Sequence, residues 1–404
     1  MPSIGDSLDL TIDSVAYRGQ GVARHEGMVI FVAGVAPGER VRARIVKLRR
    51  NYAEAQLLAV QASSPDRIPP CCLLPNGARV PGCVYDHLAY PAEVALKQRQ
   101  AEEFLRRLPG GDALAFATPF PSPLDRHYRN KIVLHSQRTP RDRIPRLGYV
   151  GDDNRTVIDS PVCPLARAEI DTALADFRRS GDFRNLRDAE AVTFRWTPSD
   201  GVVWWRGENP PHSHLTEAAP FGAVRVPADR FYQVNPEVAA ELVRQVAMWF
   251  QEAADDCADL LDLYCGVGVF AIACAKAGAG RVEGIESGRT AIAAAIENAR
   301  AHDVQAAFHC RTMLAAAQDG FGGFDMTRAT VLVDPPRQGL EPEVAQALAQ
   351  ARPPRLCYVS CDPATLARDL KLLLPAGYAL RHARVFDMFP RTAHFETAVW
   401  LVRQ

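Results

Sequence analysis

The stretch at 262–270 constrains the fold of this chain more than any other. An apolar run of strand length begins at Leu260 and leads into Asp-Leu-Tyr-Cys-Gly-Val-Gly-Val-Phe, and small helix-forming residues continue through 271–275. A strand, a tight glycine turn and a helix form the opening unit of a nucleotide-binding α/β fold. Gly266 and Gly268 lack a Cβ atom, so the backbone there can turn sharply and approach a ligand closely.

The next predicted strand adds a carboxylate for a nucleoside ligand. It ends in Glu286, eighteen residues after Gly268, and its side chain can accept hydrogen bonds from both hydroxyls of an adenosine ribose. The glycine spacing also fits the loose dinucleotide pattern, so an NAD-dependent dehydrogenase stays open at this point. Asp262 and Tyr264 before the turn, and Phe270 after it, are more similar to the S-adenosylmethionine loop of class I methyltransferases.

Two later predicted strands end in residues that can carry chemistry. The run at 329–333 is followed by Asp334, and the run at 356–360 is followed by Cys361. Ligands bind at the carboxyl ends of strands in open parallel sheets. Asp362 is a natural N-cap, so Cys361 is expected to face the positive end of a helix dipole. That position predicts a lowered thiol pKa and a thiolate nucleophile.

A final predicted strand at 397–402 begins just after Glu396. If this strand is antiparallel to its neighbours, Glu396 lies at the same ligand-binding edge as Cys361. His394 is the rival candidate for a base, although a histidine so close to a strand is at least as often engaged in a local hydrogen bond.

Residues 4–60 predict several short strands separated by glycine turns, which is typical of a small β-barrel. Arg40, Arg42 and Arg44 alternate with apolar residues on one run, so their side chains are expected on one face, where they could bind RNA phosphates. A solvated charged strand is the alternative interpretation. The whole segment resembles a TRAM domain, an RNA-binding barrel attached to RNA-modifying enzymes.

Charge and targeting features narrow the partners. Lys plus Arg and Asp plus Glu both number 47, so RNA would be held by local basic patches and not by a global field. The middle of the chain offers such a patch on predicted strands and loops, made of Arg129, Lys131, Arg138, Arg141, Arg143 and Arg146. The chain has no apolar run of membrane-spanning length and no signal-peptide pattern, which predicts a cytoplasmic protein without a membrane partner.

Four cysteines suggest a metal site. Cys71, Cys72 and Cys83 are grouped, and Cys163 follows at a distance. Ten cysteines in a cytoplasmic chain argue for reduced thiols, not for a disulfide framework. Four thiolates suit an iron–sulfur cluster or zinc, with unligated packing cysteines as the alternative.

Four motifs together resemble the RNA 5-methyluridine methyltransferases. They are Asp-Leu-Tyr-Cys-Gly from 262, Asp-Pro-Pro-Arg from 334, Ser-Cys-Asp-Pro-Ala-Thr-Leu-Ala-Arg-Asp from 360, and Phe-Pro-Arg-Thr-x-His-x-Glu-Thr from 389. The resemblance implies an α/β protein with a small N-terminal β-barrel of the TRAM or OB-like type over 1–62. A mixed α/β central domain is implied over 63–229, and a Rossmann-like class I methyltransferase domain over 230–404.

The resemblance also implies roles for individual residues. It implies S-adenosylmethionine contacts at Gln233, Tyr264, Glu286 and Asp334, and Gly266 of the glycine turn is a further candidate for cofactor binding. Cys361 is implied as the nucleophile and Glu396 as the base, and Phe389 or Arg337 could hold the target base.

The family's 4Fe–4S motif is only partly present. That motif reads Cys-x5-Cys-x2-Cys with a distant fourth cysteine. Cys83 matches its third position and Cys163 its distant one, but Val80 and Leu74 occupy the other two. The tandem cysteines at 71–72 are left to supply the missing ligands, or the cluster is altered or absent.

These expectations predict methylation of C5 of a uridine in structured RNA, through a covalent adduct between Cys361 and C6. Ribosomal 23S RNA is the favoured substrate, with the TΨC loop of tRNA as the alternative, and the protein is expected to be a monomer. A dehydrogenase would leave Asp334, Cys361 and Glu396 without roles. A cytosine-C5 methyltransferase would carry a cysteine in the strand that here reads Asp-Pro-Pro-Arg. An RNA-binding assembly factor with an inactive methyltransferase domain is the non-enzymatic alternative.

Overall fold

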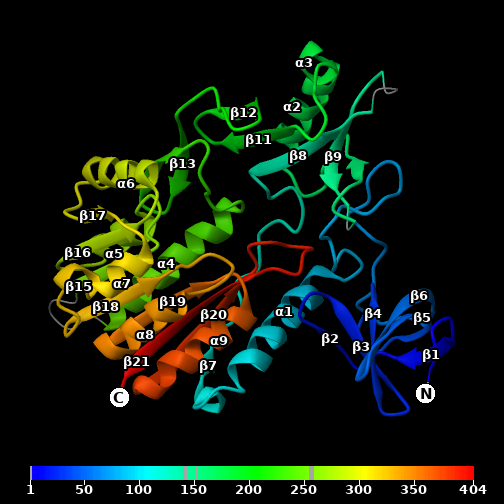
Figure 1. The fold of residues 1–404 in the computed structure, drawn as a ribbon, viewed down its shortest axis with the longest axis horizontal. Helices are drawn as coiled ribbons and strands as arrows, with labels where there is room; N and C mark the ends of the chain where they lie inside the picture. Colours follow the sequence, from blue (N-terminus) through cyan, green and yellow to red (C-terminus); the bar gives the residue numbers. More distant parts are fainter. Residues whose placement is uncertain (1, 140–142, 152, 254–258) are drawn as a thin grey trace.

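The computed structural model describes residues 2–139, 143–151, 153–253 and 259–404. It contains an N-terminal sheet, a central sheet with a separate hairpin, and a large C-terminal sheet covered by helices (Figure 1). This architecture confirms the predicted α/β class with a strand-rich N-terminal domain. Arg141, one of the predicted basic residues, lies outside the described residues. Within the described ranges, no helix combines the length and the apolar character that crossing a membrane requires.

Six strands form the N-terminal barrel, defined here as residues 7–62, in the order β1-β5-β6-β4-β3-β2. Their bounds are Ser7–Thr11 (β1), Ser14–Ala16 (β2), Gln20–His25 (β3), Met28–Ala33 (β4), Arg40–Leu48 (β5) and Tyr52–Ala62 (β6). Along β5, Arg40, Arg42 and Arg44 are exposed and alternate with buried Val41 and Ala43. The apolar residues therefore fill the barrel core, and the three arginine side chains share the outer face.

Eight strands form the C-terminal sheet, in the order β17-β16-β15-β18-β19-β21-β20-β7. Their bounds are Ala115–Phe116 (β7), Asp259–Leu263 (β15), Val282–Glu286 (β16), Ala307–Cys310 (β17), Ala329–Val333 (β18), Arg355–Ser360 (β19), Tyr378–Phe386 (β20) and Glu396–Arg403 (β21). The strands from β15 to β19 are mutually parallel, and β21 runs antiparallel between β19 and β20. All five residues of β18 are buried, as expected for a parallel strand covered on both faces.

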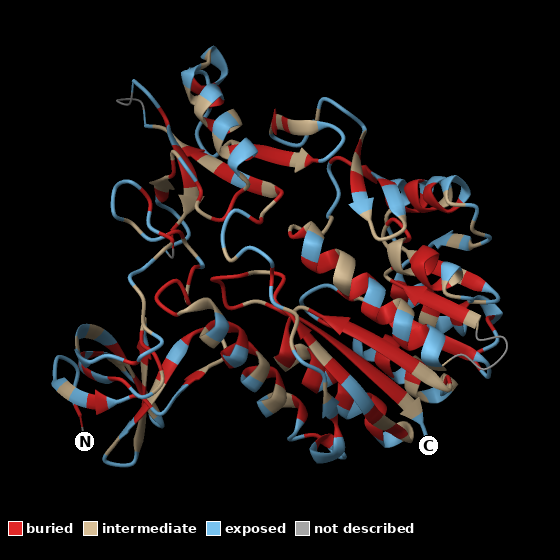
Figure 2. Cartoon of the chain, turned by 180° about the vertical axis from the view of Figure 1, so that it is seen from behind, coloured by how far each residue is buried: buried red, intermediate tan, exposed pale blue. Residues whose placement is uncertain are grey.

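Helices cover both faces of this sheet, and the buried strands lie between them (Figure 2). One face packs against α4 (Pro236–Ala253) and α5 (Val269–Lys276), and α6 (Arg289–Ala301) lies beside β16 and β17. The other face packs against α7 (Met313–Gln318), α8 (Pro342–Ala351), α9 (Pro363–Leu373) and α1 (Tyr90–Leu105). Helix α1 precedes the central sheet in sequence, so the N-terminal half of the chain contributes to the C-terminal core.

The central sheet has the order β10-β9-β8-β11-β12 and is entirely antiparallel. Its strands are Lys131–Gln137 (β8), Arg146–Val150 (β9), Val157–Asp159 (β10), Ala191–Thr197 (β11) and Gly201–Arg206 (β12), with helices Ala168–Arg179 (α2) and Gly181–Arg184 (α3). A separate hairpin, His214–Ala219 (β13) and Gly222–Pro227 (β14), packs against α6. There the backbone N–H of Arg225 donates to Asn298 Oδ1 at 2.8 Å, and Asn298 Nδ2 donates to the Arg225 carbonyl at 3.0 Å.

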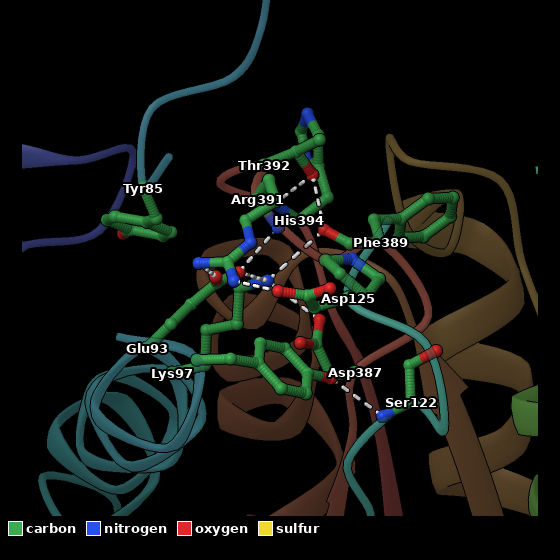
Figure 3. Close-up of polar contacts among 12 residues, drawn as sticks. Tyr85, Glu93, Lys97, Ser122, Asp125, Asp387, Phe389, Arg391, Thr392 and His394 are labelled. Atoms are coloured by element: carbon green, nitrogen blue, oxygen red, sulfur yellow. Dashed lines mark hydrogen bonds and ion pairs between the residues drawn. The ribbon is translucent and has the colours of Figure 1, made fainter. Parts of the chain in front are cut away.

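A buried lysine connects α1 to the loop between β20 and β21 (Figure 3). Lys97 Nζ donates to Glu93 Oε1 at 2.8 Å, to Asp387 Oδ1 at 2.7 Å and to the Phe389 carbonyl at 3.2 Å. Burial alone would lower the pKa of the Lys97 ammonium, but Asp387 and Glu93 outweigh burial and raise that pKa. The lysine therefore stays charged and anchors the loop that leads to β21.

Arg391, a residue of the same loop, also fastens it to α1 and to neighbouring segments (Figure 3). Its buried guanidinium donates to the Leu88 carbonyl at 2.7 Å and to Glu93 Oε2 at 3.2 Å, and it forms an ion pair with Asp125. Its own carbonyl accepts hydrogen bonds from the backbone N–H groups of 84–85, at 2.9 and 3.1 Å. The loop before β21 is thus held by segments that lie far away in the sequence.

We expect Lys97→Met to destabilise the fold strongly. Methionine fills a similar volume but leaves buried Asp387 without its lysine cation and leaves Glu93 with Arg391 alone, and the loss of one partner of a buried pair costs about 3–5 kcal/mol. Urea denaturation would measure the loss. Lys371→Met on the exposed side of α9 is the matched control and should change the free energy of unfolding by less than about 0.5 kcal/mol. Equal losses for the two variants would contradict the anchoring role.

Candidate active site

The glycine turn joins β15 to α5 as predicted. Buried Asp262 accepts a hydrogen bond from the backbone N–H of Ala271 at 3.1 Å, which fixes the first turn of α5. Gly266 and Gly268 have φ values of 53° and 84°, in the left-handed region that favours glycine. Tyr264 also has a positive φ, 64°, and such strained non-glycine residues cluster at functional sites. No atom lies within 4 Å of the position a Cβ on Gly266 would take, so the turn borders open space.

A cavity of about 1260 Å³ lies at the carboxyl ends of the parallel strands. The predicted cofactor and catalytic residues all line it, namely Gln233, Tyr264, Gly266, Glu286, Asp334, Cys361 and Glu396. The structure therefore brings together residues that the sequence spreads over more than a third of the chain. Strand ends meet at one edge of a parallel sheet, which is why they converge.

The cavity lining includes a fixed carboxylate and an unpaired buried acceptor. Glu286 stands at the end of β16, and its Oε1 accepts hydrogen bonds from the Gly288 N–H at 2.8 Å and the Ser287 hydroxyl at 3.0 Å. The buried Oε1 atom of Gln233 has no hydrogen-bond partner among the described residues. An orphaned buried acceptor is costly unless a ligand satisfies it. The open glycine turn, the fixed carboxylate and the free acceptor together suit a polar nucleoside ligand.

Strand pairing places Cys361 beside Glu396. Ser360, the last residue of β19, is paired with Thr397 of antiparallel β21. One further step along the same register brings Cys361 opposite Glu396. The predicted antiparallel direction of this strand is thus present, and it sets the thiol and the carboxyl side by side at the cavity wall.

The prediction of a lowered thiol pKa at Cys361 is wrong. Burial and neighbouring Glu396 raise the pKa of the Cys361 thiol to about 12, and Arg337 opposes this rise only in part. The dipole of α9 does not lower the pKa of Cys361, because the Asp362 carboxylate caps the start of this helix. Its Oδ1 accepts the free N–H groups of residues 364–365 at the start of α9, at 2.9 and 3.1 Å, so a carboxylate already occupies the positive helix end.

The two candidate bases differ in the direction of their pKa shifts. Burial and Asp334 raise the pKa of the Glu396 carboxyl well above its usual range. Burial and Arg337 lower the pKa of the His394 imidazole to about 4. The His394 ring packs edge-on against Phe389, with centroids 6.3 Å apart. A group with a higher pKa is the stronger proton acceptor once ionised, which favours Glu396 over His394.

The cavity rim holds basic residues that the sequence did not assign to the site. Arg18 from the N-terminal barrel, Arg129 from the central part of the chain and Arg230 before α4 all line the cavity. Phe389 and Arg337, the suggested holders of a target base, also line it. The sequence offered no signal for Arg18 as a site residue, because its proximity depends on how the barrel packs.

The predicted iron–sulfur or zinc site is not supported. Cys72, Cys83 and Cys163 share one apolar core cluster, yet within the described ranges no three His, Cys, Asp or Glu side chains are placed to hold a metal ion. The Cys163 sulfur accepts a hydrogen bond from the Tyr149 hydroxyl at 3.0 Å. A hydrogen bond with Cys72, together with burial, raises the pKa of the Cys71 thiol. The contacts shown for these thiols are thus hydrogen bonds and apolar packing.

Two known protein families match segments of this chain. Residues 222–404 match the family described as tRNA (uracil-5-)-methyltransferase, and residues 3–58 match the TRAM domain. The 23S rRNA (uracil(1939)-C(5))-methyltransferase RlmD of Pseudomonas putida is 31% identical to this chain, and the alignment covers 97% of this chain and 93% of the relative. RlmD of Azoarcus sp. is 31% identical, with 96% and 97% covered.

A solved structure matches the whole architecture. The tRNA (uracil-54, C5)-methyltransferase of Pyrococcus abyssi, in complex with S-adenosyl-L-homocysteine, superposes with a TM-score of 0.74 at 25% identity. The superposition covers 98% of this chain and 99% of that one. The likeness therefore extends over the barrel, the central sheet and the C-terminal sheet together.

The raised pKa of Cys361 predicts how the free protein reacts with iodoacetamide. Only the thiolate is alkylated, so the rate at Cys361 should rise about tenfold per pH unit from pH 7 to pH 9.5. Mass spectrometry of the peptide that contains Cys361 would measure the rate, with exposed Cys310 as an internal standard for reagent consumption. A rate at Cys361 that is fast at pH 7 and level above it would reveal a stable thiolate and contradict the raised pKa.

Proposed function

The chain belongs to the family of RNA uracil-C5 methyltransferases, and we propose that its substrate is a uridine of large-subunit ribosomal RNA. Two relatives that align over nearly their whole length are named for uracil 1939 of 23S rRNA, whereas the solved structure of similar fold is named for uracil 54 of tRNA. Higher identity to the ribosomal enzymes supports rRNA over tRNA.

The main support for the proposed chemistry is the pairing of β19 with β21. The antiparallel pairing of β19 with β21 sets Cys361 and Glu396 side by side in the cavity that also holds Gln233, Glu286 and Asp334. A nucleophile, a base and a nucleoside-type ligand site then share one space. Uracil-C5 methylation needs all three within reach of a single ring.

The proposed first step begins at Cys361. C5 of uracil is too weak a nucleophile to take a methyl group unaided. Cys361 first loses its thiol proton to solvent. When the resulting thiolate bonds to C6, the C5–C6 electron pair moves into an enolate that spreads over C5 and the C4 carbonyl. Arg337 lowers the pKa of the thiol against the neighbouring carboxyls, so it favours the thiolate that this step requires.

S-adenosylmethionine supplies an electrophilic methyl group. Gln233, Tyr264, Glu286 and Asp334 are the residues that would hold it. The positive φ of Tyr264 and its hydroxyl bond to Glu341 keep this side chain at the cavity wall. Burial raises the pKa of the Asp334 carboxyl to about 7.

The last step returns the ring to aromatic uracil. After methylation, C5 carries both the methyl group and its original hydrogen. The Glu396 carboxylate takes that proton, the electron pair re-forms the C5–C6 double bond, and Cys361 leaves as a thiolate. The raised pKa of Glu396 makes its carboxylate a stronger base for this step. Both reacting atoms of the ring must reach one pocket, so the uridine has to leave its stack.

Blocking the two roles separately should give opposite results. Cys361→Ala should form no covalent complex and transfer no methyl group, because the C6 bond cannot form. Glu396→Gln should accumulate a methylated protein–RNA adduct that survives denaturation, because the C5 proton stays in place. RNA containing 5-fluorouridine should trap the unsubstituted enzyme in the same way, since fluorine cannot leave as a cation.

Denaturing gel electrophoresis with labelled RNA and labelled cofactor would read out these adducts. Cys310→Ala and Glu343→Gln replace exposed residues of the same types and should turn over normally. An adduct formed by Cys361→Ala would assign the nucleophile elsewhere. Normal turnover by Glu396→Gln would assign the base elsewhere, with His394 the next residue to substitute.

The choice of RNA is tested in cells that lack this protein. We expect 5-methyluridine to disappear from one position of 23S rRNA while tRNA keeps its own, and mass spectrometric mapping would locate the position. The intact gene should restore the modification and the Cys361→Ala gene should not. Loss from tRNA alone would support the tRNA alternative, and unchanged modification of both RNAs with defective ribosome assembly would support a non-enzymatic factor.

A further inference from the structure

A turn of the N-terminal barrel reaches the catalytic cavity. Residues 16–19 connect β2 to β3, and the Gly19 N–H donates to the Ala16 carbonyl at 3.0 Å. Arg18 has a φ of 74° at the turn position that usually requires glycine. A Cβ on Gly19 would lie 2.8 Å from the Val84 Cβ atom, so the turn packs tightly on the segment after the barrel. A strained arginine at a cavity wall calls for an explanation.

Tyr17 in this turn contacts the neighbours of both proposed catalytic residues. Its hydroxyl donates to Asp362 Oδ2 at 3.2 Å, and Asp362 directly follows Cys361. Its ring packs edge-on against Phe395, with centroids 6.0 Å apart, and Phe395 directly precedes Glu396. One side chain from the barrel therefore braces the two backbone segments that present the thiol and the carboxyl.

The bond from Tyr17 completes the fixation of Asp362. The other carboxylate oxygen of Asp362, Oδ1, caps α9, and the Asp362 carbonyl accepts from the Ser360 hydroxyl at 3.0 Å. With both carboxylate oxygens engaged, the side chain has one allowed orientation. The peptide between Ser360 and Asp362, which carries Cys361, is then held on each side.

Arg18 presents a cation at the mouth of the cavity. Its side chain is 73% exposed and lies 3.8 Å from Asp362 Oδ2, and it lines the cavity together with Cys361. An exposed ion pair at this distance contributes little stability. Its guanidinium can therefore donate to the oxygens of a phosphodiester, which match its planar fork of N–H groups.

We propose that this turn is a working part of the active site, with Tyr17 as a positioning residue for Cys361 and Glu396. Arg18 binds the phosphodiester group next to the target uridine. The inference rests on the proposed function and deepens it. On this view the barrel supplies groups to the chemistry and does not serve only as an RNA tether.

The role of Tyr17 is tested by removing a single oxygen. Tyr17→Phe keeps the ring contact with Phe395 and loses the hydrogen bond to Asp362. In the full chain with saturating 5-fluorouridine RNA, we expect the rate of covalent adduct formation to fall about tenfold while the RNA dissociation constant changes less than about twofold. Tyr52→Phe removes the hydroxyl of a half-buried barrel tyrosine that packs on Phe31 and should change neither value.

A second readout separates positioning from a loss of folding. The charged and titratable groups around Cys361 are Glu396, Asp334, Arg337 and Asp362, besides the turn itself. Tyr17→Phe leaves the four groups in place but removes the donor that neutralises part of the Asp362 charge. Iodoacetamide alkylation of Cys361 without RNA should slow by roughly threefold at pH 9, which corresponds to an upward pKa change of about half a unit. An unchanged alkylation profile and an unchanged adduct rate would overturn the positioning role.

The role of Arg18 is tested by removing charge from the RNA. A methylphosphonate at the phosphate beside the 5-fluorouridine should weaken binding to the intact enzyme about tenfold, and it should have no further effect on Arg18→Ala. Arg44→Ala, on the outer face of the barrel, should keep the full methylphosphonate effect. If Arg18→Ala keeps that effect at every phosphate tested, Arg18 does not bind the backbone there and this part of the proposal falls.

Failure of the proposed function has a different appearance. In that case neither the intact enzyme nor the Tyr17→Phe variant forms a covalent adduct with 5-fluorouridine RNA. If the intact enzyme forms the adduct and Cys361→Ala does not, the proposed chemistry holds. Equal rates for Tyr17→Phe and the intact enzyme then contradict only the inference about the turn.

Discussion

The antiparallel entry of β21 between β19 and β20 is the constraint on which the candidate site depends. The side-chain direction alternates along a strand, so a slip of one residue in this register would turn Glu396 away from the cavity. The pairing of Ser360 with Thr397, together with that of Phe386 with Glu396, keeps the carboxyl in place. A backbone pattern thus determines which two side chains can act on one ring.

The same pairing creates an electrostatic cost. Glu396, Asp334 and Asp362 crowd around the Cys361 thiol, and burial raises the pKa of Cys361 and Glu396. Burial therefore opposes ionisation of both groups in the free protein. This arrangement protects the thiol from stray alkylation and keeps the carboxyl a strong base, at the expense of a nucleophile that must be ionised during the reaction.

The cavity is a composite of segments that lie far apart in the chain. The loop before β21 is held by buried Lys97 and Arg391, through α1 and the segment after the barrel. The barrel adds Tyr17 and Arg18, and the central part adds Arg129. Buried Lys97 and Arg391 contribute less to net stability than to holding the loop in one arrangement, because leaving a buried partner unpaired would be costly. The contact of Tyr17 with Asp362 and the backbone bonds to Arg391 hold the barrel and the segment after it against the C-terminal sheet.

Several features of the fold and the site could be predicted because they depend on local pattern. The glycine turn, the strand ends at Asp334 and Cys361, and the alternating barrel arginines follow from spacing and periodicity, and strand ends of a parallel sheet must meet at one edge. Three-dimensional packing was needed to show the sign of the Cys361 pKa shift, the lack of a three-ligand metal site among the described residues and the reach of Tyr17 to Asp362. These properties depend on which groups come within a few ångströms of one another in space. The spacing of residues along the chain does not predict such long-range contacts.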